Sequence, residues 1–247
     1  MNFFKKFAAE FLGTFIFVLF GCGVSVVFRT TSLAPATAYL GTAIAFGFGL
    51  IVAYYCVGSI SGCHVNPAVS LGMLISKKMS ILEFLVYIVG QFCGGVIAAL
   101  LLQGFFHLSG NQALDLGANQ VNTEMVGNGG DSLALGFGIV TLLSFIFVFL
   151  TIQLSSKKDN NSVSGLVAGL TLIVIYLLET AFTGGSINPA RSLGPALTAM
   201  INGIYEPIKQ IWIFILAPLV GGTLAGGLYT LFTHFSHKKE MRLGINR

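Results

Sequence analysis

Residues 66–72 read Asn-Pro-Ala-Val-Ser-Leu-Gly and residues 188–194 read Asn-Pro-Ala-Arg-Ser-Leu-Gly, so six of seven positions match at an offset of 122. Gly62 matches Gly184 at the same offset. Gly94-Gly95, which follow the first of these segments, have a counterpart in Gly221-Gly222, which follow the second after a slightly longer spacer. The chain therefore contains an internal repeat, with halves covering about residues 1–106 and 132–234.

The composition places this repeat in a membrane. Of 247 residues, 55% are apolar and only 9% are charged, whereas a soluble domain carries roughly 25% charged residues. This balance excludes a disordered chain, a nucleic-acid-binding domain and a typical cytosolic enzyme. The cysteines lie in apolar runs without C-x-x-C spacing or a nearby histidine cluster, which argues against a disulfide framework or a metal site; they are Cys22, Cys56, Cys63 and Cys93.

Six apolar runs have the length that a transmembrane helix needs, about 20 residues. They cover about residues 7–28, 37–58, 80–105, 132–155, 163–182 and 207–234. Two further runs, 66–76 and 188–199, are too short to cross and are typical of re-entrant segments. The sequence thus predicts an all-α membrane protein with six transmembrane helices and two re-entrant half-helices. We expect one transmembrane domain over residues 1–247, with a C-terminal tail at 235–247.

The positions of the basic residues predict the orientation. With the N-terminus inside, ten lie on the cytoplasmic side: Lys5, Lys6, Lys77, Lys78, Lys157, Lys158, Lys238, Lys239, Arg242 and Arg247. Only Arg29 and Lys209 fall in outer loops, alongside the outer acids Asp115, Glu124 and Asp131. This bias follows the positive-inside rule. The protein is therefore expected in the cell (plasma) membrane, with both termini on its cytoplasmic side.

Each half has three spans, so the second half enters the membrane from the opposite side. Such inverted repeats place a site near the bilayer midplane, where interrupted helices meet. Asn is a favoured N-cap and Pro is favoured at the first helical position, so Asn66-Pro67-Ala68 and Asn188-Pro189-Ala190 each predict the start of a half-helix. Two positive helix ends then face each other. The centre should donate hydrogen bonds and repel cations.

With six spans, paired Asn-Pro-Ala boxes and Arg191 after the second box, the chain resembles the aquaporin (major intrinsic protein) family over essentially its whole length. The resemblance implies a passive channel that conducts water in single file, without a cofactor, in a bacterial cell membrane. It also implies a homotetramer. Water, possible small neutral solutes and the lipid bilayer are the expected partners, and no nucleic acid is expected.

The resemblance also implies an outer selectivity filter made of Phe46, Tyr176, Gly185 and Arg191. A guanidinium inside the membrane is costly unless it faces water or a partner, so Arg191 is expected to face the pore rather than a structural ion pair. Phe46 has an alternative as an ordinary core or lipid-facing aromatic. Tyr176 and Gly185 depart from the water-selective pattern, in which His usually replaces Tyr176.

Markers that separate the water and glycerol branches favour water. Ser192, Ala196 and Phe214 resemble water channels, whereas Ile215 points the other way. A facilitator of glycerol, urea, ammonia or hydrogen peroxide stays open as an alternative. A coupled secondary transporter, which also uses inverted repeats, is a more distant one, because no titratable group is expected between the boxes.

Four further residues are expected near the loops that carry the boxes. Glu10 matches a family glutamate that braces the first re-entrant loop, and His64 is expected to pack in that loop. The repeat predicts a second acid in the fourth span, but that span has none, and Glu179 is left either to brace the outer loop or to reach Arg191. Cys63 is expected to border the lumen as a possible mercurial site, with a simply buried thiol as the alternative.

Overall fold

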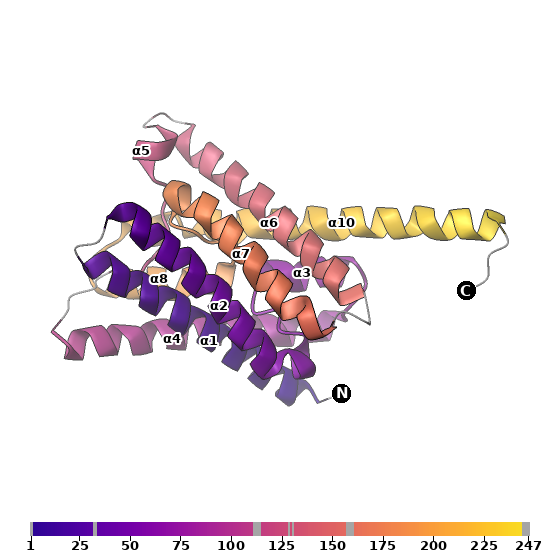
Figure 1. Ribbon diagram of the computed structural model, residues 1–247, viewed down its shortest axis with the longest axis horizontal. Helices are drawn as coiled ribbons and strands as arrows, with labels where there is room; N and C mark the ends of the chain where they lie inside the picture. Colours follow the sequence, from indigo (N-terminus) through magenta and orange to yellow (C-terminus); the bar gives the residue numbers. More distant parts are fainter. Residues whose placement is uncertain are drawn as a thin grey trace.

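The computed structural model is a bundle of long helices, described here for residues 2–31, 34–110, 115–127, 129, 131–156 and 161–243 (Figure 1). Within these ranges six helices are long and apolar enough to cross a membrane, with mean hydropathies between 1.9 and 2.6. They are α1 (Phe3–Thr30), α2 (Pro35–Ser61), α4 (Ile81–Leu108), α6 (Ser132–Ser156), α7 (Asn161–Thr183) and α10 (Ile211–Leu243). The six predicted spans are confirmed, and α10 continues as a helix into the predicted tail.

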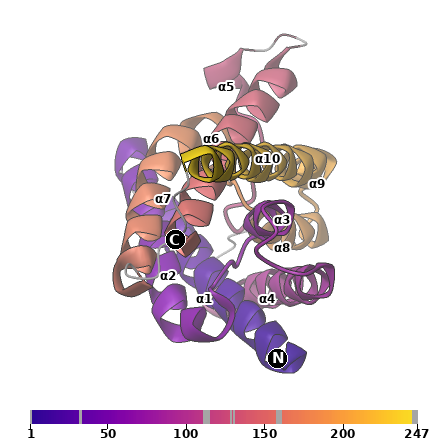
Figure 2. The same ribbon diagram turned by 90° about the vertical axis from the view of Figure 1, so that its right-hand side faces the viewer.

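Two short helices occupy the interior of the bundle. They are α3 (Pro67–Ile75) and α8 (Pro189–Ile201), and each begins at the proline of an Asn-Pro-Ala box. Seen from the end that holds the N-terminus, α3 and α8 lie between α4 and α10 (Figure 2). Two single-turn helices, α5 (Thr123–Val126) and α9 (Glu206–Lys209), belong to the connections at the opposite end.

Glycines allow the half-helices to approach their neighbours at backbone distance. A Cβ at Gly95 on α4 would collide with the carbonyl oxygen of Ala190, and a Cβ at Gly222 on α10 would collide with that of Ala68. Small residues let membrane helices pack this closely. The two contacts are equivalent in the two halves, as expected for a repeat, and the predicted fold class is confirmed.

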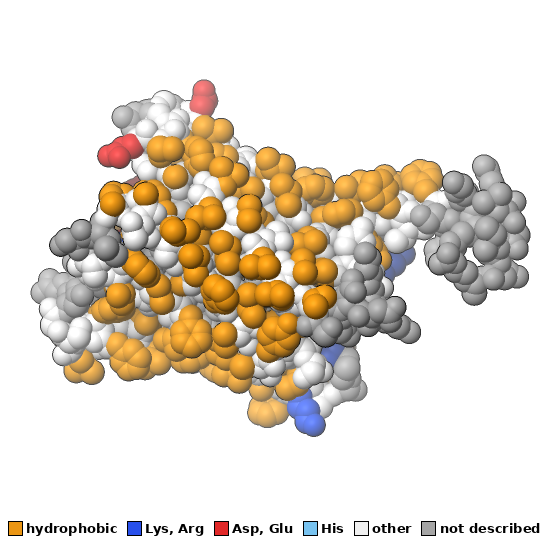
Figure 3. Space-filling view, viewed as in Figure 1, with side chains coloured by type: hydrophobic (Ala, Val, Ile, Leu, Met, Phe, Trp, Pro, Cys, Tyr) orange, Lys and Arg blue, Asp and Glu red, His pale blue; other side chains and the backbone are white. Residues whose placement is uncertain are grey.

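The outer surface matches a lipid environment. Large apolar side chains are exposed along every long helix, and Figure 3 shows them covering the middle of the molecule. The acidic side chains in this view lie at the end that holds α5, and the lysine and arginine side chains lie toward the other end. Among the predicted cytoplasmic charges, Lys157, Lys158 and Arg247 lie outside the described residues, as do the side chains of Lys238, Lys239 and Arg242.

Candidate functional site: a central pore

The two Asn-Pro-Ala boxes meet at the centre and are tied to each other. Asn66 accepts a hydrogen bond from the Ala68 backbone at 2.8 Å, and Asn188 accepts one from Ala190 at 3.0 Å, so each side-chain oxygen caps its own half-helix. Each side-chain nitrogen crosses to the other loop. Asn66 Nδ2 donates to the Ile187 carbonyl at 3.0 Å, and Asn188 Nδ2 donates to the Val65 carbonyl at 2.8 Å.

This cross-linking fixes how the asparagines point. Each amide nitrogen carries two hydrogens, and in each case one is used by the opposite loop. The second hydrogen of each Asn has no acceptor recorded among the described residues, so it is available to a molecule passing between the boxes. The positive ends of α3 and α8 meet at the same point, which makes the centre unfavourable for cations.

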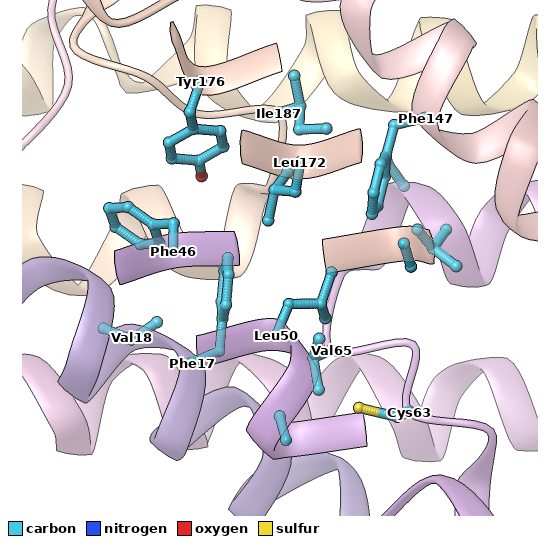
Figure 4. Close-up of a cluster of buried hydrophobic side chains, with 14 of the residues drawn as sticks. Phe17, Val18, Phe46, Leu50, Cys63, Val65, Phe147, Leu172, Tyr176 and Ile187 are labelled. Atoms are coloured by element: carbon cyan, nitrogen blue, oxygen red, sulfur yellow. The ribbon is translucent and has the colours of Figure 1, made fainter. Parts of the chain in front are cut away.

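Three of the four predicted filter side chains lie together in the half of the bundle near α5. The ring centroids of Phe46 and Tyr176 are 4.7 Å apart, and the Arg191 guanidinium carbon lies 4.6 Å from the Phe46 centroid. All three side chains are fully buried. Figure 4 shows Phe46 and Tyr176 at one side of the buried cluster, with the tyrosine hydroxyl pointing toward Phe46. The Tyr176 hydroxyl and the Nε and Nη2 atoms of Arg191 have no hydrogen-bond partner in the described structure.

The fourth position, Gly185, lies against Tyr176. Its φ of 78° is in the left-handed region, which favours glycine. A Cβ at this position would lie 3.1 Å from Tyr176 Cδ1 and 2.7 Å from Thr180 Oγ1. A side chain at position 185 would therefore collide first with the Thr180 hydroxyl and would also press against the Tyr176 ring.

Arg191 is held by a loop residue that the sequence reasoning missed. Its Nη1 donates to the Asn119 Oδ1 at 2.6 Å and to the Gly117 carbonyl at 2.9 Å. Ser192 Oγ donates to the same Asn119 oxygen at 3.0 Å. Asn119 comes from the connection between α4 and α6, where no repeat or motif spacing marks it. Its amide side chain and its place near the outer acids are the features of the sequence that could have suggested it as a partner of Arg191.

Glu179 does not form an ion pair with Arg191 among the described residues. Instead, its carboxylate accepts a hydrogen bond from Thr183 Oγ1 at 3.0 Å, and the backbone of Ser186 lies close to it. Of the two roles open to Glu179, the contacts favour the outer loop.

The loop before the first box converges on Glu10. The Glu10 carboxylate accepts hydrogen bonds from the His64 and Val65 backbone at 2.9 and 2.7 Å, from Ser61 Oγ at 2.6 Å and from Gln91 Nε2 at 2.6 Å. Val65 and the neighbouring Cys63 have positive φ values of 44° and 53°. A β-branched residue in this region is strained, so the buried carboxylate holds the loop in a conformation that it would not adopt alone.

His64 packs in the same loop. Its Nδ1 lies 3.1 Å from Ser70 Oγ on α3, and its ring centroid lies 4.9 Å from that of Tyr87. The Tyr87 hydroxyl donates to the Ser61 carbonyl at 2.7 Å. His64 thus joins the loop to α3 and α4.

A cavity of about 720 Å³ opens on the far side of the boxes from the Phe46 cluster. Its lining includes Tyr54, Cys63, His64, Val69 and Lys78. Cys63 therefore borders a solvent-sized space while its side chain is only 5% exposed overall. Within the described part of the chain, no group of three or more His, Cys, Asp or Glu residues could hold a metal ion.

Together the fold and the central arrangement define a multi-pass helical membrane channel. The sequence model described as Major intrinsic protein matches residues 1–229. The chain is 35% identical over 222 residues to "Glycerol uptake facilitator protein-like 6" of Lactiplantibacillus plantarum, covering 90% of this chain and 94% of that protein. It is 34% identical over 232 residues to "Aquaporin Z" of Bradyrhizobium diazoefficiens, covering 91% and 92% of the two chains.

A solved structure shares the fold. The X-ray structure of the aquaglyceroporin from Plasmodium falciparum superposes with a TM-score of 0.81 at 23% identity, over 93% of this chain and 96% of that one. The chain belongs to the major intrinsic protein family, whose members are membrane channels.

Proposed function

We propose that the chain is a passive water channel that excludes ions and protons. The observation that supports this most is the cluster of Phe46, Tyr176 and Arg191, in which the Phe46 ring lies 4.7 Å from the Tyr176 ring and 4.6 Å from the Arg191 guanidinium carbon. Its unpartnered polar atoms can hydrogen-bond a molecule in the pore. The aromatic rings leave little room for a solute with a carbon backbone.

Exclusion of ions follows from the charges around this path. Arg191 repels cations, and the helix ends at the two boxes present positive partial charges. Asn66 and Asn188 offer donors rather than acceptors at the centre. A cation would lose its hydration shell without gaining ligands.

A facilitator of small neutral solutes is the second candidate. Gly185 contributes no side chain to the filter, and a relative carries the name of a glycerol uptake facilitator. The position of the Tyr176 ring supports water instead, because the ring lies beside Gly185 and against Phe46 and so fills part of the filter that the missing side chain would leave open. Ammonia and hydrogen peroxide are close to water in size, so the proposed filter would also admit them.

We further propose that the channel lies in the cell membrane with both termini in the cytoplasm, as the basic residues predict. A homotetramer is proposed from the family resemblance alone. The cavity bordered by Cys63 and Lys78 then opens to the cytoplasm, and the Phe46 cluster faces outward.

Stopped-flow light scattering on proteoliposomes tests the function. Purified protein should speed vesicle shrinkage in an impermeant osmolyte, without a proton leak and with little uptake of glycerol or urea. The Tyr176→Ala variant should admit glycerol, because it removes the ring that lies against Gly185. Water permeability equal to that of empty vesicles contradicts the proposal. Uptake that depends on an ion gradient indicates the coupled transporter.

A further inference from the structure

The loops before the two boxes are braced by carboxylates that come from different helices. The contacts of α4 and α10 give the correspondence between α1 and α6. Gly94 approaches the backbone of Phe11 and Phe15, and Gly221 approaches that of Thr141 and Phe145. Phe11 thus corresponds to Thr141 and Phe15 to Phe145, an offset of 130. At this offset the counterpart of Glu10 is Val140, which is fully buried.

The correspondence between α2 and α7 is set by another pair of glycines. A Cβ at Gly47 would lie 2.6 Å from the Gly169 carbonyl oxygen, and a Cβ at Gly169 would lie 2.6 Å from that of Gly47. The offset is 122, the same as between the boxes. At this offset Glu179 corresponds to Val57.

Carboxylate and valine have therefore exchanged helices between the two halves. The first half has Glu10 on α1 and Val57 on α2, and the second has Val140 on α6 and Glu179 on α7. The exchange is sterically reasonable, because α1 and α2 meet at this level: a Cβ at Gly13, one turn after Glu10, would lie 2.9 Å from Val57 Cγ2.

The hydrogen-bond donors did not exchange. Ser61 donates to Glu10 at 2.6 Å, and Thr183, which corresponds to Ser61 at the offset of 122, donates to Glu179 at 3.0 Å. Both carboxylates also meet the backbone of the loop that precedes their box: Glu10 accepts from the N–H groups of His64 and Val65, and Glu179 lies close to the backbone of Ser186. The two acids thus meet equivalent partners from different directions.

We propose that Glu179 is the positioning residue of the outer loop, 184–187, and that it thereby sets Gly185 and Arg191 in the filter; this rests on the proposed function. A chain of polar contacts connects the two. The Ser186 backbone lies close to Glu179, and the Ser186 Oγ atom lies 2.6 Å from Ser192 Oγ. Ser192 donates to Asn119 Oδ1, which also accepts from Arg191.

One difference separates the two braces. Gln91 donates to Glu10, but its counterpart on α10, at the offset of 127 that relates Gly94 to Gly221, is Pro218, which has no side-chain donor. Accordingly, the Oε2 atom of Glu179 is buried without a partner. An amide nitrogen at this position displaces no existing bond, so Glu179→Gln keeps the brace, whereas a Gln at position 10 turns its nitrogen toward donors.

The test compares Glu179→Val, Glu179→Gln and the exchanged double variant Val140→Glu/Glu179→Val, with Glu206→Gln as an exposed acidic control at the same end. The first readout is the ratio of glycerol to water permeability. We expect Glu179→Val to raise it about tenfold, the factor for losing about one hydrogen bond to a charged group. Glu179→Gln, the double variant and the control should stay within about twofold of the parent.

The second readout, hydrogen exchange of the Ser186 amide, does not depend on conduction. It should be faster in Glu179→Val and slow again in the double variant. This readout stands even if the parent conducts no water, which would remove the proposed function but not the brace. A folded Glu179→Val channel with the parent's ratio and exchange overturns the inference. If Glu179→Val does not fold, a double variant that fails to restore folding and the slow exchange overturns it.

Discussion

The Arg191 guanidinium carbon lies 4.6 Å from the centre of the Phe46 ring, while its Nη1 atom is bound to Asn119 and Gly117. The ring and the loop together fix the side chain, which leaves Nε and Nη2 without a protein partner. A cation over an aromatic face gains about 2 kcal/mol when desolvated. These contacts hold the guanidinium in the position that the proposed filter requires.

Replacement of Arg191 by Val should make the pore leaky. The change removes the charge that repels cations and widens the constriction, so proton conductance and glycerol permeability should both rise by about tenfold or more, as for a barrier lowered by about 1.4 kcal/mol. Proton flux into vesicles loaded with a pH-sensitive dye measures the first, and light scattering the second.

Lys209→Val provides the control for loss of a basic residue, because Lys209 is exposed and pairs with Glu206 on α9 at the same end. It should conduct like the parent. A proton flux in Arg191→Val that equals that of this control contradicts the assignment of Arg191.

Removal of the Asn119 side chain should loosen Arg191 without removing its charge. Asn119→Ala loses the acceptor of both Arg191 and Ser192, and we expect about 1–2 kcal/mol lower stability of the folded channel. Glycerol permeability should rise less than in Arg191→Val, with proton exclusion largely kept. Asn119→Asp keeps an acceptor oxygen and should stay close to the parent in both assays. Equal behaviour of the two variants contradicts the role of Asn119.

The transmembrane helices and the two half-helices could be predicted from the sequence, because each depends on residues that are close together in the chain. Apolar length gives the spans, and the Asn-Pro pair gives the start of each half-helix, so Asn66 and Asn188 are fixed by cap chemistry alone. The positions of Phe46 and Tyr176 required the family resemblance in addition, since nothing in an aromatic-rich helix distinguishes them.

The remaining features depend on contacts that no local pattern carries. Asn119 reaches Arg191 across 72 residues from an irregular connection. The packing of Tyr176 against Gly185 depends on the left-handed backbone at the glycine and on the path of the loop. The repeat predicted an acid on the fourth span, and sequence alone could not show that the carboxylate contacting the outer loop comes from α7.

Loss of the Glu10 carboxylate should destabilise the whole channel. Glu10→Ala leaves four buried donors without an acceptor, which we expect to cost on the order of 3–5 kcal/mol. Glu10→Gln keeps one acceptor oxygen but turns an amide nitrogen either toward the donors Val65 and Gln91 or toward the donors Ser61 and His64, and its stability should lie between those of the parent and Glu10→Ala. Thermal unfolding in detergent measures the stabilities of the parent and the two variants. Glu206→Gln, a change at an exposed residue, should unfold at the parent's temperature. If Glu10→Ala unfolds at the same temperature as the parent, Glu10 does not stabilise the loop before the first box.

Mercurial reagents should block the channel through Cys63. The thiol borders the cavity next to the first box, in a segment held rigid by Glu10, so a bound mercury atom would stand in the path of water. We expect mercuric chloride to reduce water permeability severalfold and a reducing agent to restore it. Cys63→Ser should abolish this sensitivity with normal basal flow. Cys56→Ser and Cys93→Ser alter exposed cysteines that do not line the cavity, and should stay sensitive. Inhibition that persists in Cys63→Ser but disappears in one of the others would place the reactive thiol outside the pore.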